Sequence, residues 1–96
     1  MSKLRNEEID SLFEAILTLE NIEECYKFFE DACTIKELKD LAQRFHVAKL
    51  LKDGKNYQEI NAETGMSTAT ICRASKCLNY GEGGYMTAIE RLEKKG

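Results

Sequence analysis

The sequence contains no proline and only one histidine. It also has no apolar run that approaches about 18 residues, the length that a membrane-spanning helix needs, so we expect no membrane partner. Acidic residues soon follow the N-terminus and leave no apolar segment for a secretory signal. Four cysteines are present, but no two of them form a Cys-x-x-Cys pair. We therefore expect reduced thiols, no metal site, no required cofactor and a cytoplasmic location.

Charge is unevenly distributed along the 96 residues, whose formal net charge is −3. Residues 1–43 hold five Lys/Arg and eleven Asp/Glu, whereas residues 44–96 hold nine and six. The length fits a single domain, 1–96, near the low end of what buries a core by itself. The acidic total argues against a nucleic-acid ligand, but the basic surplus of the second half permits one, because attraction to phosphate depends on the local face.

The β-branched residues do not alternate over useful lengths, so the sequence predicts an all-α fold of about six helices. Residues suited to capping mark the helix starts: Asn6, Thr34 with Glu37, Asn56 with Glu59, and Ser67. The helices are expected at about 7–17, 20–32, 35–52, 57–64, 68–79 and 85–95.

The helix at 35–52 is apolar on two opposite sides. One side carries Leu38, Leu41, Ala42, Phe45 and Ala48, and the other carries Val47, Leu50 and Leu51. Such a helix must be covered on both sides, and in so short a chain a second copy is the natural cover. The pattern therefore predicts a homodimer.

The segment "TGMSTATICRASK", 64–76, joins two short helices through a turn that contains Gly65. Glycine suits the left-handed position that ends a helix, and Ile60, Met66 and Ile71 can brace the pair. Two helices joined in this way form a helix-turn-helix, predicted here at about 56–79. The second helix begins with small side chains, which favours entry into the major groove of double-stranded DNA.

Nine residues of this motif are candidate DNA contacts. Methyl groups of Thr and Ala can meet thymine methyls, hydroxyls can bond to bases or phosphates, and Arg and Lys suit phosphates or guanine. The set comprises Gln58, Asn61, Ser67, Thr68, Ala69, Thr70, Cys72, Arg73 and Lys76.

Other interpretations of the motif stay open. The same corner also fits the scaffold of a helical protein-interaction module, or a DNA-binding factor that acts outside transcription. An enzyme that uses a cysteine and His46 is disfavoured, because the sequence supplies no positioned base and orienting group for a nucleophile. We therefore expect no enzymatic activity.

The run Gly65, Ala69-Thr70-Ile71 and Arg73 resembles the Gly-x-x-x-Ala-Thr-Ile-x-Arg run of the Trp repressor superfamily. The resemblance covers roughly 28–81, and "KCLNYGEGGY", 76–85, is most similar to the Trp-repressor-like YerC/YecD family. It implies six helices, an intertwined twofold dimer, and two helix-turn-helix heads that enter successive major grooves of an operator, about 34 Å apart. The implied function is sequence-specific transcriptional regulation, in the form of repression.

The resemblance also implies a site for a small-molecule corepressor. Thr34, Arg44 and Arg73 match residues of the family's tryptophan pocket. Ala74 replaces a glycine and adds a methyl where the indole would pack, and Cys77 replaces a serine with a poorer hydrogen-bonding group. We therefore expect no tryptophan binding of repressor-like strength. The protein either senses another metabolite through Thr34, Arg44, Arg73 and Cys77, or binds DNA without one.

Overall fold

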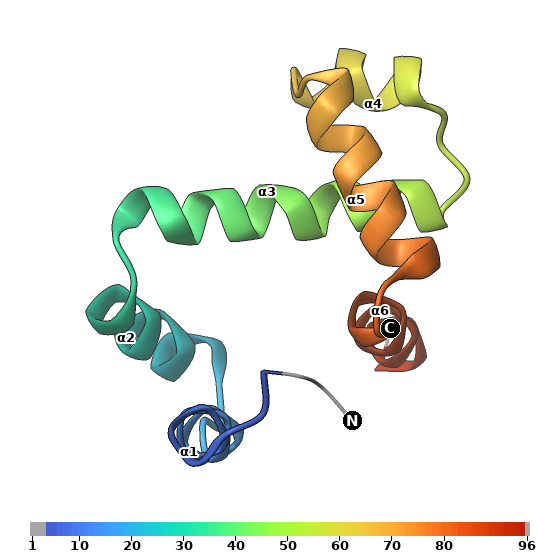
Figure 1. The fold of residues 1–96 in the computed structure, drawn as a ribbon. Helices are drawn as coiled ribbons and strands as arrows, with labels where there is room; N and C mark the ends of the chain where they lie inside the picture. The colour runs from blue at the N-terminus through green and yellow to red at the C-terminus, as the bar shows by residue number, and fades with distance from the viewer. Residues whose placement is uncertain (1–3, 96) are drawn as a thin grey trace. The chain divides into compact units, whose positions relative to one another are not determined.

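The computed structural model describes residues 4–95, and this part of the chain forms six helices and no strand. Figure 1 shows them in chain order: α1 (Glu7–Leu17), α2 (Ile22–Ala32), α3 (Ile35–Lys52), α4 (Tyr57–Thr64), α5 (Thr68–Tyr80) and α6 (Gly84–Lys95). The predicted all-α class is confirmed. Within residues 4–95, no helix combines the length and the apolar character that crossing a membrane needs.

Side-chain caps begin α1, α3, α4 and α5, as the sequence predicts. The Thr34 hydroxyl accepts a hydrogen bond from the Glu37 N–H (3.1 Å), and the Glu37 carboxylate accepts one from the Thr34 N–H (2.8 Å). The bond from the Thr34 backbone lowers the pKa of Glu37 below its ordinary value, and the Thr34 side chain adds to this. The prediction for the second helix is wrong by two residues. This helix begins at Ile22 because Asn21 is its cap and accepts the Glu24 N–H at 2.8 Å.

The chain divides into two compact units, the first ending at Leu38 and the second starting at Lys39. The first unit contains α1, α2 and the first turn of α3. Neither α1 nor α2 has a buried residue, and Leu17, Ile22 and Tyr26 are each more than half exposed. The described part of this unit therefore carries large apolar side chains that the chain itself leaves in water.

The second unit holds two clusters of buried side chains. The first cluster joins α3 to α4 and α5 through Val47, Leu50, Ile60, Ile71 and Ala74. The second joins α3 to α5 and α6 through Ala48, Leu78 and Ile89. Phe45 packs against the second cluster, with its ring edge-to-face with that of Tyr85 and the two centroids 5.6 Å apart. These clusters fix α5 between α3, α4 and α6.

The second half of α3 needs no second copy to cover it, contrary to the expectation from its two apolar sides. Val47 and Ala48, one from each side, are fully buried within the single chain. They are covered because α4, α5 and α6 fold back over both sides of α3. Leu41, in the first half of the helix, is 42% exposed. Most of the large exposed apolar side chains therefore lie in the earlier part of the chain, although Tyr57, Tyr80 and Leu92 are exposed as well.

Candidate nucleic-acid interface

The predicted helix-turn-helix consists of α4, a three-residue turn and α5, which Figure 1 shows joined at a sharp corner. At the start of α4, the side chains and backbone N–H groups of Asn56 and Glu59 form reciprocal hydrogen bonds of 2.9 Å. The helix ends at Gly65, whose φ of +73° is left-handed and whose N–H donates to the Asn61 carbonyl at 2.8 Å. A residue with a Cβ would destabilise the fold by about 1–2 kcal/mol at this position, because its Cβ disfavours the left-handed conformation. Glycine therefore sets the corner.

Side-chain hydrogen bonds hold the turn in place. The Asn61 amide donates to the Met66 carbonyl at 2.7 Å, while the Thr64 hydroxyl donates to the Ile60 carbonyl (2.7 Å) and accepts the Met66 N–H (3.2 Å). The Ser67 hydroxyl caps α5 by accepting the N–H three residues later, at 3.2 Å. Asn61 and Ser67, both predicted DNA contacts, thus also determine the direction in which α5 leaves the turn.

One side of α5, here called its inner face, consists of Ile71, Ala74 and Leu78, all of which are buried. Ile71 and its partner Ile60 on α4 are fully buried, as the predicted bracing role requires. Met66 is half-buried and packs against the same cluster. The inner face therefore anchors α5 and cannot meet an external ligand.

The opposite side, here called the outer face, is exposed and consists of Ala69, Arg73, Lys76 and Tyr80. At 100° per residue these four positions fall within about 60° of one another. Among the other predicted contacts, Gln58 and Thr68 are exposed, and Cys72 and Thr70 are half-buried.

Charge also distinguishes α5 from the helices before it. It contains no Asp or Glu, whereas α1, α2, α3 and α4 each carry an acidic residue in the first turn. The positive end of its helix dipole is therefore not neutralised by its own side chains. The Lys55 ammonium, just before α4, already forms an ion pair with Glu63 at 2.9 Å. The hydrogen bond to Glu63 raises the pKa of Lys55 above its ordinary value.

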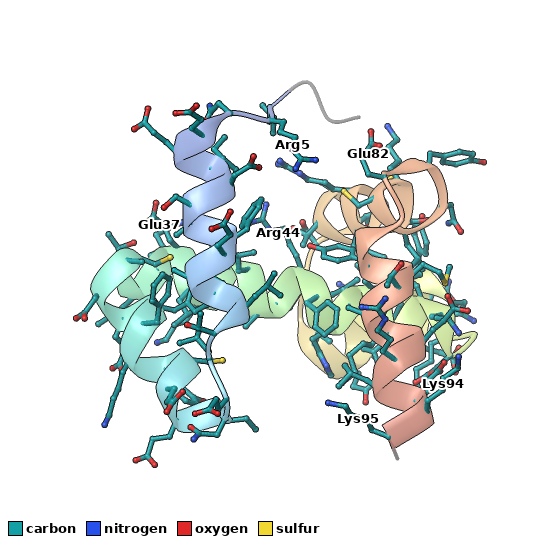
Figure 2. The ribbon with its side chains drawn as sticks, turned by 90° about the horizontal axis from the view of Figure 1, so that it is seen from below. Arg5, Glu37, Arg44, Glu82, Lys94 and Lys95 are labelled. Atoms are coloured by element: carbon teal, nitrogen blue, oxygen red, sulfur yellow. The ribbon has the colours of Figure 1, made fainter. Side chains whose placement is uncertain are left out.

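A hollow of about 280 Å³ lies beside α5, within the second unit. Its lining residues are all polar: Asp40, Gln43 and Arg44 from α3, and Thr70 and Arg73 from α5. The Nε atom of Arg44, a side chain labelled in Figure 2, is buried and has no hydrogen-bond partner. Two guanidinium groups and one carboxylate line the hollow, so its formal charge is positive and it suits a small anion better than an apolar ring.

Comparison with known proteins decides the family. Residues 7–93 match the family of the Trp repressor protein. The chain belongs to the Trp repressor family. It is 51% identical over 94 residues to the uncharacterized protein YerC of Bacillus subtilis (strain 168), a match that covers 98% of this chain and 90% of that protein.

Two solved structures have the same fold. They are a candidate Trp repressor from Staphylococcus aureus and a TrpR-like protein from Eubacterium eligens ATCC 27750. Each is 49% identical to this chain with a TM-score of 0.89, covering 95% of this chain and 91% and 94% of theirs, respectively. The resemblance and the fold inferred from the sequence are thus confirmed. Membership in this family indicates a DNA-binding regulator.

Three of the four residues that the family resemblance assigns to a ligand belong to the second unit, and of these Arg44 and Arg73 line the hollow together whereas Cys77 does not. Thr34 belongs to the first unit. The Thr34 hydroxyl caps α3, and the Cys77 thiol is free and exposed. The methyl of Ala74, expected where an indole would pack, is instead buried in the core cluster around Ile71 and Ile60.

Three residues of the interface were not among the sequence predictions. Asp40 and Gln43 line the hollow with Arg44, and helical spacing is the signal that could have indicated them, because Asp40 lies three residues before Gln43 and four before Arg44. Tyr80 extends the outer face, where it follows Lys76 by four residues. These three residues become apparent only when a whole side of a helix is considered, whereas the sequence motif centres on the turn.

Proposed function

We propose that this protein is a sequence-specific DNA-binding transcriptional regulator that acts as a twofold dimer, most simply as a repressor. One observation carries the proposal: α5 buries its inner face completely and exposes an outer face that holds two cations and no acid. Burial on one side gives a rigid helix, and exposure on the other leaves that helix available to a polyanion.

The N-terminal half of α5 is the part that would enter the major groove. An α-helix is about 10–12 Å across with its side chains, and the groove is about 12 Å wide, so small residues at the contact allow close approach. Thr68 and Ala69 are small and exposed. Their methyl groups suit thymine methyls, and the Thr68 hydroxyl suits a base edge or a phosphate. Arg73 and Lys76 follow on the same helix and suit phosphates.

Dimerisation is supported by the first unit, whose exposed apolar side chains need a cover. They include Leu12, Phe13, Leu17, Ile22 and Tyr26. Burying one such side chain contributes about 1.5–3 kcal/mol, so a surface of this size favours association with a second copy. Two heads related by twofold symmetry would then read two half-sites of one operator.

Selection from random double-stranded oligonucleotides tests this function. We expect enrichment of palindromic duplexes whose half-sites lie about 10–10.5 base pairs apart, or a multiple of that spacing, with affinity that falls as salt rises. Sedimentation equilibrium should give a dimer. Ala69→Glu, a change at an exposed position, should abolish DNA binding while the helical circular dichroism is kept. Failure to enrich any sequence at low salt would contradict the proposal and favour the interaction module.

The ligand that fits the hollow best is a small anion and not tryptophan. An unpaired buried donor such as the Arg44 Nε costs about 1–3 kcal/mol, which an anionic acceptor would remove. In calorimetry, L-tryptophan should give no binding at micromolar concentration. Inorganic phosphate at constant ionic strength should raise the melting temperature of the wild type more than that of Arg44→Gln. Micromolar tryptophan binding would contradict the assignment, and equal phosphate effects would favour DNA binding without a ligand.

A further inference from the structure

Tyr80, the last residue of α5, is 88% exposed. It lies on the outer face, seven residues after Arg73 and four after Lys76. Within residues 4–95, the structure contains no hydrogen bond to its phenol. A tyrosine combines a flat apolar ring with a polar tip, a combination enriched at interfaces. Its ring and hydroxyl both lack a partner among the described residues, so this side chain is available to an external one.

The position of Tyr80 along α5 indicates which part of a duplex it can reach. Ala69 lies eleven residues earlier on the same face, which at 1.5 Å per residue is about 16 Å along the helix axis. The major groove is about 12 Å wide. When the start of α5 lies against base edges, the end of the helix therefore lies past them, at the phosphates that border the groove. Lys76, one turn before Tyr80, makes this end of the outer face attractive to an anion.

We propose that Tyr80 is a further DNA-contacting residue whose phenol donates a hydrogen bond to a backbone phosphate, a role that rests on the DNA binding proposed above. A hydroxyl donor of this kind neutralises no phosphate charge, so the bond adds affinity without releasing a counterion. Lys76 differs in this respect, because a lysine that neutralises a phosphate contributes to the salt dependence of binding. Loss of the Tyr80 hydroxyl should therefore lower affinity without changing the salt slope, whereas loss of the Lys76 charge should change that slope.

The test measures binding of the full chain to its selected operator duplex between about 50 and 200 mM salt, the range over which phosphate contacts dominate. Three variants are compared with the wild type. Tyr80→Phe removes only the phenol oxygen. Tyr85→Phe removes the same atom from a tyrosine of α6 but keeps the ring that packs against Phe45, and it serves as the matched control. Lys76→Ala reports the charge-dependent signature. Circular dichroism and sedimentation equilibrium verify helicity and association of each variant.

We expect Tyr80→Phe to weaken binding about tenfold or more, as for loss of a hydrogen bond to a charged group, at every salt concentration and with an unchanged salt slope. Tyr85→Phe should bind as the wild type does. Equal binding by Tyr80→Phe and wild type would overturn the role of Tyr80 while leaving the proposed function intact. Loss of dimerisation in Tyr80→Phe would also overturn it, by assigning the side chain to a contact between copies. Absence of wild-type binding would overturn both.

Discussion

Shortening Ile71 tests whether the inner face of α5 holds the helix-turn-helix together. Its side chain is fully buried in the cluster with Val47, Leu50 and Ile60. Ile71→Ala deletes three carbon atoms, worth about 2.4 kcal/mol at about 0.8 kcal/mol each, and the remaining cavity brings the expected loss of stability to about 2–5 kcal/mol. Ile71→Val deletes one carbon and should cost about 0.5–1.5 kcal/mol. Domains are typically stable by only about 5–15 kcal/mol, so the larger loss is readily measured.

Urea unfolding followed by far-UV circular dichroism measures these losses, at one fixed protein concentration because association contributes to stability. The dependence of the unfolding free energy on urea should be unchanged, with the midpoint shifted. Thr68→Ala is the control on the same helix, and because Thr68 is exposed it should change stability by no more than about 0.5 kcal/mol. A cost below about 1 kcal/mol for Ile71→Ala, or an equal cost for Thr68→Ala, would refute the assignment of the two faces.

Three further predictions concern the corner, the outer face and a cap. Gly65→Ala should destabilise the protein by about 1–2 kcal/mol in urea unfolding, because φ is +73° there; no loss would contradict a left-handed turn. Lys76→Ala should lower the salt slope of DNA binding by about 0.9 per phosphate contact, hence about 1.8 for two heads, and Lys95→Ala at the end of α6 (Figure 2) should not. Since the pKa of Glu37 is lowered by its bonds to Thr34, the stability it contributes is present above the ordinary glutamate pKa and is lost as pH falls through the lowered value. Glu37→Gln should therefore be less stable than wild type at neutral pH, with a difference that shrinks in acid unfolding curves; a constant difference would exclude this linkage.

The local features of this protein follow from short stretches of its sequence. A cap such as Thr34 with Glu37 involves residues three apart, and the corner at Gly65 depends on one backbone conformation, so both can be predicted without knowledge of the tertiary fold. The same holds for the helical class and for the bracing pair Ile60 and Ile71, whose spacing around the turn places them together. The family resemblance likewise rests on short stretches, the run from Gly65 to Arg73 and residues 76–85.

Only the tertiary structure decided what covers each helix and which distant residues meet. Val47 and Ala48 belong to the two different apolar sides of α3. Whether α4–α6 or a second copy covers them depends on how the helices pack, which the apolar pattern alone does not specify. Likewise, Arg44 and Arg73 share a hollow whereas Cys77 does not line it, because residues far apart in the chain meet only through helix packing. The sequence determined where helices begin, end and turn, through interactions within a few residues. The packing of those helices determined which side of α5 is free to bind.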